Sequence, residues 1–485
     1  MPQKIANFID GEFRQSSAKD WITLFDPSTG AEIGLVPCSL VEELNEAVEA
    51  AQRAQRQWAQ VPVKERVQVL FRLKTILEER TPQLAEVIVQ ENGKTLAEAK
   101  GSILRAVECV EFATSLPQIL DNRVLEVSRG VECKLYRYPL GVVAGITPFN
   151  FPLMVPLWMV PLAIGCGNAF ILKPSEQTPL SALEIAKALQ EAGLPRGIFS
   201  VVHGAKAVVE SICEHPDIRA VGFVGSSKVA KAVYQRASAA GKRVRALGGA
   251  KNHLVVVADA DEEMTASNVV ASVTGCTGQR CMAASVLLAV GEVEHILEKI
   301  REKMAALVPG KDLGPMISFG AKERVLGYLE AAEKSDDAKI LLDGRKIAPQ
   351  SEGEGYFLGA SIVECQNPQH PLAQEEIFGP VLTVIRCRNL DEALEIENRN
   401  PYGNAAAIYT SSGQLAQYFA DRASAGMIGV NIGVPVPREP FPFGGWNQSR
   451  FGDGDITGWE GLSFWTQAKK ITTKWSDQYR SNWMS

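Results

Sequence analysis

The chain has 485 residues, of which 46% are hydrophobic and 22% are charged, with 41 Gly and 26 Pro. This ordinary globular composition excludes a disordered chain, a collagen and a coiled coil, and the length suits roughly two to three domains. The 50 Lys and Arg against 56 Asp and Glu give a net charge of −6. Because nucleic-acid binding requires a dense basic surface, we expect no nucleic-acid partner.

The sequence also gives no sign of export or of a metal centre. Nine cysteines are scattered along it without a Cys-x-x-Cys pair, so they indicate neither a disulfide framework nor a zinc module. The first residues, Met1 to Gly11, lack the apolar run of a signal peptide. We therefore expect a cytoplasmic protein without a metal site.

One apolar run, residues 151–170, approaches the length of about 20 residues that a membrane span needs. It contains Pro152, Pro156 and Pro161. Prolines remove backbone donors and clash with the preceding helical turn. The run is thus predicted to form a broken helix in a core, and no membrane partner is expected.

Taken in chain order, the segment 41–117 has helical spacing, and the segment from about 140 to 250 alternates short β-branched runs with helices. A helix there is expected to have Thr178 as its cap and Pro179 in its first turn, and to end at Gly193. The strands expected in this segment are 141–146, 169–173, 198–202, 220–224 and 243–247, and the other helices are 205–214 and 226–240. This alternation is typical of a doubly wound parallel sheet.

The pattern restarts after residue 250 and predicts a second α/β unit. Its expected strands are 254–257, 285–290, 381–385 and 405–409, and its expected helices are 293–307, 321–334, 391–398 and 413–423. Two further segments, 131–139 and 462–475, alternate apolar and polar residues as half-exposed strands do. Such strands suit pairing across a subunit boundary.

The strongest local candidate for chemistry is Cys281, which follows a segment with Gly275 and Gly278. Glycines allow backbone amides to converge on a bound atom. The neighbouring cation Arg280 should favour the thiolate, the form that attacks an electrophilic carbon. Considered alone, such a cysteine is more often a small core residue.

Turns after the predicted strands offer groups for an oxyanion and for a nucleotide. Asn150 follows the first strand and could donate an amide N–H to an oxyanion. Gly225 and Ser226 open a helix and could contact a pyrophosphate, although the Gly-x-Gly-x-x-Gly fingerprint is missing. Lys173 and Glu176 could bind ribose hydroxyls, and this carboxylate would repel a 2′-phosphate, which favours NAD over NADP.

In this order and spacing these pieces resemble the aldehyde dehydrogenase superfamily over nearly the whole chain. Each motif is weak alone, but seven in register leave little room for chance. The matching segments are 147–153, 171–179, 223–227, 278–281, 375–380, 400–403 and 443–445. The domains that the resemblance implies are a Rossmann-like NAD-binding domain over 1–120 and 140–248, an α/β catalytic domain over 249–445, and bridging, oligomerising segments at 121–139 and 446–485.

The resemblance also implies a role for each candidate residue. Cys281 would be the nucleophile, and Asn150 and the Cys281 amide would form the oxyanion hole. Glu376 and Phe378 would surround the nicotinamide ribose and ring. The residues that would hold NAD are Thr147, Phe149, Lys173, Glu176, Gly225, Ser226, Glu376 and Phe378.

One departure from the family pattern is informative. Hydrolytic members carry a Glu, the base that activates water, 34 residues before the nucleophile, and that position is Leu247 here. Without this base, hydrolysis of the thioester should lose about 10²–10⁴-fold in rate. A thiolate is a better nucleophile than water and needs no enzymic carboxylate once ionised, so thiolysis is consistent with Leu247.

The segments 249–253, 278–282 and 437–453 resemble the CoA-acylating methylmalonate-semialdehyde dehydrogenase branch. That branch releases its acyl group to coenzyme A, and it implies a substrate with its own carboxylate. Such a substrate calls for a fork-shaped cation. The two candidates are Arg280, beside the nucleophile, and Arg105, which matches the family's second carboxylate-binding arginine.

The sequence thus predicts an NAD-dependent, CoA-acylating semialdehyde dehydrogenase of α/β fold, assembled as a homodimer or homotetramer. Malonate semialdehyde or its 2-methyl derivative would be oxidised to a thioester on Cys281. This thioester would lose its β-carboxylate, and CoA would take the acetyl or propionyl unit. Two alternatives stay open: a hydrolytic semialdehyde dehydrogenase that yields a free acid, and a non-catalytic protein that reuses the fold.

Overall fold

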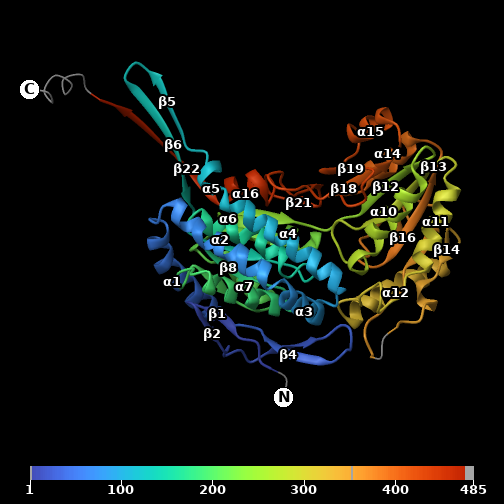
Figure 1. Cartoon of the computed structure of the whole chain (residues 1–485), viewed down its shortest axis with the longest axis horizontal. Coiled ribbons are helices and arrows are strands. Elements are labelled where there is room, and N and C mark those ends of the chain that lie inside the picture. Colours follow the sequence, from blue (N-terminus) through green and yellow to red (C-terminus); the bar gives the residue numbers. More distant parts are fainter. Residues whose placement is uncertain (1–2, 351–352, 476–485) are drawn as a thin grey trace, which may run out of the picture.

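The computed structural model describes residues 3–350 and 353–475, whose strands form two large sheets with helices on both faces (Figure 1). The first sheet of this part of the chain has eight strands, in the order β2 (Glu12–Arg14), β1 (Asn7–Ile9), β9 (Phe199–Val201), β8 (Ala169–Lys173), β7 (Val142–Ile146), β10 (Ile218–Val224), β11 (Arg243–Leu247) and β21 (Arg450–Phe451). The predicted α/β class is confirmed.

The central strands of this sheet, from β9 to β11, run parallel, as the alternating sequence pattern predicts. β7 and β8 are buried along their whole length, which explains their almost continuous apolar sequences. The chain order reverses at β7, because β8 and β9 lie on one side of it and β10 and β11 on the other. In open α/β sheets, ligands bind beyond the carboxyl ends of the strands at such a reversal.

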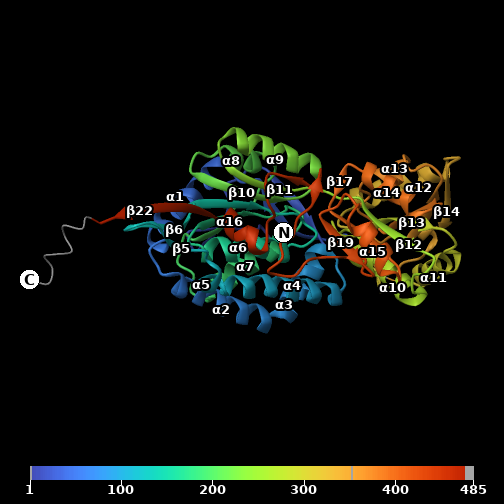
Figure 2. The ribbon, with the colours of Figure 1, turned by 90° about the horizontal axis from the view of Figure 1, so that it is seen from above.

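Helices cover both faces of this sheet (Figure 2). One face carries α1 (Val41–Trp58), α8 (Lys206–Glu214) and α9 (Ser227–Ala239), and the other carries α2 (Val63–Glu79), α4 (Leu96–Thr114), α6 (Met154–Gly165) and α7 (Leu180–Glu191). Every residue of α6 is buried, and Pro161 lies inside it, so the prediction of a buried helix in the apolar run is confirmed. Among the described residues, no helix is both long enough and apolar enough to cross a membrane.

The second sheet of the described chain has seven strands, in the order β14 (Ala338–Leu342), β15 (Ser361–Cys365), β16 (Val381–Cys387), β13 (Ala284–Val290), β12 (Asn252–Val257), β18 (Ala405–Tyr409) and β19 (Met427–Val430). One face packs against α10 (Glu262–Thr274) and α11 (Glu294–Ala305), and the other against α12 (Phe319–Glu333), α14 (Leu390–Arg399) and α15 (Gly413–Ala420). The apolar side chains of each face form their own core cluster.

A three-stranded sheet, hereafter the arm, projects from the body (Figure 1). It consists of β5 (Arg123–Ser128), β6 (Val131–Pro139) and β22 (Thr466–Lys474), so the two predicted half-exposed strands pair with each other. The predicted strand 462–475 is wrong at its start, because 462–464 belong to α16 (Gly458–Phe464), whose apolar residues pack into the core.

The division of the chain into domains stays a prediction. Residues 1–2 of the predicted NAD-binding domain and 476–485 of the predicted oligomerising segment lie outside the described residues.

The start of α7 differs from the sequence prediction, because Thr178 is not its cap. Instead the carboxylate of Glu91, the penultimate residue of helix α3 (Thr81–Asn92), accepts hydrogen bonds from the Leu180 amide at 2.6 Å and the Ser181 amide at 3.0 Å. Glu91 is fully buried, and burial raises the pKa of this carboxyl to about 7. A buried side chain from another helix thus satisfies the first N–H groups of α7.

We expect Glu91→Ala to lower the free energy of unfolding by about 1–3 kcal/mol, because it leaves buried N–H groups without an acceptor. Glu91→Gln keeps an oxygen acceptor at the same place and should lose less. Thermal and denaturant unfolding of both variants would check this. Wild-type stability of Glu91→Ala would contradict the assigned cap.

Candidate active site

Two cavities adjoin one another at Cys281. The larger, of about 660 Å³, lies beyond the carboxyl ends of β7, β8 and β10, and the smaller has about 420 Å³. Phe151, Trp158 and Cys281 line both. The larger cavity is also lined by every predicted nucleotide contact and by the predicted oxyanion donor: Thr147, Phe149, Asn150, Lys173, Glu176, Gly225, Ser226, Glu376 and Phe378.

Two asparagine side chains fix the backbone of the nucleophile candidate. The carbonyl oxygen of Cys281 accepts from Asn252 Nδ2 at 2.8 Å and from Asn404 Nδ2 at 3.0 Å. Asn252 is the first residue of β12, and Asn404 directly precedes β18, so adjacent strands of the second sheet hold this residue. No local sequence pattern singled out Asn404, although it directly follows the matching segment 400–403.

The turn before the nucleophile has an unusual backbone. Cys276 and Thr277 have φ values of 51° and 54°, a left-handed conformation that is costly for residues other than glycine. Contacts from outside the turn hold it: the Cys276 amide donates to Glu98 at 2.5 Å, and Thr277 Oγ1 donates to the Gly314 carbonyl at 2.7 Å. The sequence predicted a permissive segment here but not these partners.

The oxyanion candidate reaches the same segment from the first sheet. Asn150 Nδ2 donates to the Gln279 carbonyl at 3.1 Å, which leaves one of its two amide hydrogens for a ligand. Two buried side chains, missed by the sequence analysis, hold its loop. Lys94 Nζ donates to the Asn150 carbonyl and to Asn92 Oδ1, and Asn92 Nδ2 donates to the Phe149 carbonyl at 2.8 Å.

The electrostatics of the thiol differ from the expectation. Burial, followed by the charge of Glu376, raises the pKa of Cys281 to about 12, and the opposing effect of Arg280 is smaller. Arg280 lowers this pKa, as expected, but burial outweighs it, so the net shift disfavours the thiolate. Glu376 accepts from the Ala250 amide at 3.0 Å, and burial raises the pKa of its carboxyl to about 7.

The larger cavity has the features of a dinucleotide site. Lys173 and Glu176 form an ion pair of 2.9 Å, in which the lysine side chain is only 6% exposed. The Thr147 hydroxyl is buried and has no hydrogen-bond partner in the part of the chain that the structure describes. A polar atom buried without a partner is costly, so this hydroxyl favours a polar ligand in the cavity.

The remaining lining residues suit a pyrophosphate and an aromatic ring. The first N–H groups of α9 follow Gly225 and Ser226, and helix N-termini bind anions. A Cβ atom at Gly225 would lie 2.6 Å from the Phe223 ring, so a side chain does not fit there. Phe149 and Phe378 meet edge to face, with ring centroids 5.9 Å apart. The residues present therefore fit a nicotinamide dinucleotide.

The smaller cavity is lined by three arginines, Arg105, Arg280 and Arg438. Both Arg105 and Arg280 carry a buried Nε–H that lacks an acceptor among the described residues. The terminal nitrogen Nη2 of Arg280 donates to the backbone carbonyls of Ala271 and Ser272. Unpaired guanidinium donors beside the nucleophile favour a carboxylate-bearing ligand.

The fold and these cavities define a class of protein. The aldehyde dehydrogenase family model matches residues 13–471, and the chain belongs to this family. The chain is 45% identical to the malonate-semialdehyde dehydrogenase 2 of Geobacillus thermodenitrificans over 97% of this chain and 99% of that protein.

The chain is also similar over nearly its whole length to solved structures with related names. The methylmalonate-semialdehyde dehydrogenase of Oceanimonas doudoroffii has 39% identity and a TM-score of 0.96, with 99% of this chain and 100% of that chain covered. A Sinorhizobium meliloti protein, described as a methylmalonate-semialdehyde dehydrogenase and solved with NAD, has the same identity and TM-score over 98% of this chain and 99% of its own.

We expect Cys281 of the ligand-free chain to be alkylated slowly at neutral pH, because its pKa lies far above 7. The rate should rise about tenfold per pH unit as the thiolate fraction grows. Iodoacetamide labelling of the Cys281 peptide from about pH 7 to pH 10, followed by mass spectrometry, would measure it. Glu376→Gln removes a charge that raises this pKa and should label faster at each pH. A labelling rate that is already constant below about pH 8 would contradict the assignment.

Proposed function

We propose that this aldehyde dehydrogenase catalyses the NAD-dependent, CoA-acylating oxidation of malonate semialdehyde or methylmalonate semialdehyde. One observation carries the proposal: Cys281 lies between a cavity that fits a dinucleotide and a cavity lined by two arginines whose buried Nε–H groups lack an acceptor among the described residues. The smaller cavity, with its arginines, suits an aldehyde that carries a carboxylate. The names of the similar proteins support the same substrate class.

The residues around Cys281 would perform the first step as follows. The thiol gives up its proton to solvent and the sulfur adds to the aldehyde carbon, while Arg105 and Arg280 hold the carboxylate of the substrate. The free N–H of Asn150 and the backbone N–H of Cys281 would stabilise the oxyanion. When bound, NAD would supply the acceptor for the hydride that leaves this carbon, and a thioester would remain on Cys281.

The nucleotide would be held by residues of the larger cavity. Lys173 and Glu176 would bind the adenosine ribose, and the carboxylate would disfavour a 2′-phosphate. Gly225 and Ser226 would contact the pyrophosphate, and Glu376 would bind the nicotinamide ribose. Thr147, Phe149 and Phe378 would complete the site around the ring.

Leu247, at the position where the family resemblance implies the general base of hydrolytic members, supports transfer to CoA rather than to water. Leu247 is 3% exposed and belongs to the core of the first sheet. The carboxylates that line the two cavities in the described chain are Glu98, Glu176 and Glu376. Glu98 accepts backbone amides on both of its oxygens and Glu176 accepts from Lys173, whereas Glu376 accepts from the Ala250 amide on one oxygen only, so Glu376 is the remaining candidate base for water.

We expect a stopped-flow trace of NADH with malonate semialdehyde to show a stoichiometric burst, which becomes sustained turnover only when CoA is added. The reason is that thioester hydrolysis lacks its general base, a loss of about 10²–10⁴-fold. Equal steady turnover with and without CoA would replace this proposal by the hydrolytic one, and Glu376→Gln would then test Glu376 as the base.

We further propose that the arm assembles the protein into a homodimer or homotetramer. Its strand β5 pairs with β6 on one edge only, and Val124, Leu125 and Val127 are 60%, 66% and 54% exposed. Exposed apolar side chains on a free edge strand suit burial against another copy.

Leu125→Glu should shift the protein towards smaller assemblies in light scattering coupled to size-exclusion chromatography, because the charge would have to be desolvated in the interface. Phe319→Glu, at an equally exposed apolar position on α12, is the matched control and should leave the mass unchanged. If both variants keep the wild-type mass, the arm does not form the interface through this residue.

A further inference from the structure

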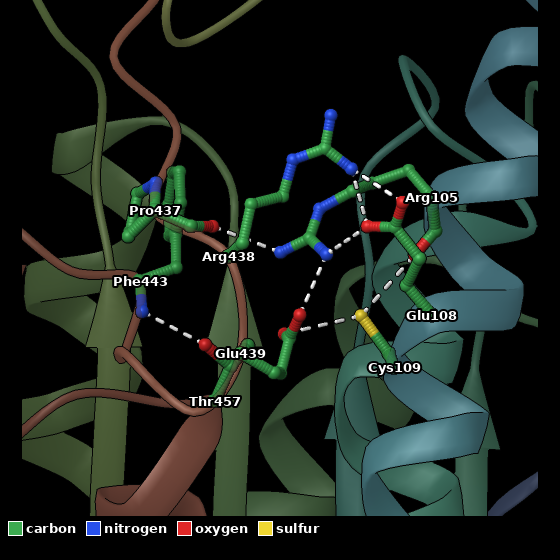
Figure 3. Close-up of polar contacts among 8 residues, drawn as sticks. All are labelled: Arg105, Glu108, Cys109, Pro437, Arg438, Glu439, Phe443 and Thr457. Carbon is green, nitrogen blue, oxygen red and sulfur yellow. Dashed lines mark hydrogen bonds and ion pairs between the residues drawn. The ribbon is translucent and has the colours of Figure 1, made fainter.

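The arginine predicted to bind the substrate's carboxylate already carries a buried carboxylate of the chain (Figure 3). Glu439 Oε2 accepts from Arg105 Nη1 at 2.6 Å, and the side chains are 7% and 13% exposed. Arg105 Nη2 donates to the Pro437 carbonyl at 2.9 Å. Both terminal nitrogens therefore engage the segment 437–439, and Nε alone lacks a partner among the described residues.

A buried thiol fixes the other oxygen of this carboxylate. Cys109, one helical turn after Arg105 on α4, donates from Sγ to Glu439 Oε1 at 3.3 Å. Burial and the charge of Glu439 raise the pKa of Cys109, so this group stays a thiol and a donor. The carboxylate of Glu439 is thus held on Arg105 from two sides.

A second carboxylate reaches Arg105 but has a different environment. Glu108 accepts from Arg105 Nη1 at 2.7 Å, yet its side chain is 45% exposed and it also pairs with Arg438. Water screens such a pair, whereas the pair of Arg105 with Glu439 is shielded from solvent. Glu439 is therefore the group that offsets the charge of Arg105 within the cavity wall.

We propose that Glu439 weakens the hold of Arg105 on the carboxylate of the substrate and thereby speeds the loss of CO₂ from the acyl-enzyme. This inference rests on the proposed function. A carboxylate that enters the cavity meets a guanidinium whose charge is already offset at 2.6 Å, so its attraction is smaller than that of a free arginine.

A weaker interaction between Arg105 and the substrate carboxylate favours the decarboxylation step. In the acyl-enzyme, the bond between the α-carbon and the carboxylate carbon breaks, and its electron pair moves into the thioester carbonyl to form an enolate. CO₂ leaves, and the enolate takes a proton from water at the α-carbon. Negative charge leaves the carboxylate in this step, so a strong ion pair there stabilises the ground state more than the transition state.

The test compares Glu439→Gln with Glu108→Gln, which removes the exposed carboxylate from the same arginine. We expect Glu439→Gln to lower KM for malonate semialdehyde at least about fivefold, since an offsetting charge is removed from a buried pair. It should also slow CO₂ release, so that CoA captures undecarboxylated thioester and malonyl-CoA appears beside acetyl-CoA. Glu108→Gln should change neither value by more than about twofold.

Propanal, an aldehyde without a carboxylate, separates this effect from damage to the site. Its kcat/KM should be the same in wild type and Glu439→Gln. Glu439→Asp keeps the charge but moves it back by one methylene, and it replaces the Gln variant if that variant does not fold. It should change KM for malonate semialdehyde and the product ratio in the same directions as expected for Glu439→Gln, but by less. An unchanged or higher KM for malonate semialdehyde, an unchanged product ratio, or equal losses on both aldehydes would overturn the inference.

Failure of the proposed function can be distinguished from failure of this inference. Wild type that shows CoA-dependent turnover while Glu439→Gln behaves identically would overturn the inference alone. Wild type without CoA-dependent turnover would overturn the proposed function. In that case the strength with which Arg105 binds a carboxylate can still be measured as the inhibition of propanal oxidation by malonate. Tighter inhibition of Glu439→Gln than of wild type would support the inference that Glu439 weakens this binding, and equal inhibition would contradict it.

Discussion

The hydrogen bonds that fix the segment around Cys281 between the two sheets are the constraint on which the site depends. Asn150 holds this segment from the end of β7, and Asn252 and Asn404 hold it from the second sheet. The turn before Cys281 contains left-handed residues that are costly by themselves, so it needs such external partners. The two cavities adjoin because the nucleophile is anchored to both sheets at once.

Much of this arrangement could be predicted from the sequence because its signals are local. Buried strands such as β7 and β8 are continuous apolar runs that end in turns, and their parallel order places the following turns at one edge. The cap of α7 could not be predicted, because Glu91 lies 89 residues before Leu180. The short strand β1 was not predicted either, although its partner β2 is local: Phe8 pairs with Phe13 in this hairpin as well as with the distant Val201.

Contacts between charged residues that are far apart in the sequence are equally hard to predict. The sequence places Leu247 34 residues before Cys281, the spacing at which the family resemblance implies a carboxylate. It does not show that Glu439 meets Arg105, since 334 residues separate them and no motif joins them. Nor does it show that burial outweighs Arg280 at Cys281, because desolvation depends on the surroundings of the folded chain rather than on adjacent residues.

The two cavities act on the thiol with opposite signs. Glu376, from the nucleotide side, raises the pKa of Cys281, and Arg280, from the substrate side, lowers it. A positive charge that enters the larger cavity would offset Glu376 and favour the thiolate, whereas a carboxylate that enters the smaller cavity would offset Arg280 and disfavour it. Under the proposed function, filling of the larger cavity would therefore favour ionisation of Cys281, and a moderate hold on the carboxylate would limit the opposing effect. The charge that Glu439 offsets at Arg105 therefore also affects the ionisation of Cys281, because it limits how strongly a carboxylate is held in the smaller cavity.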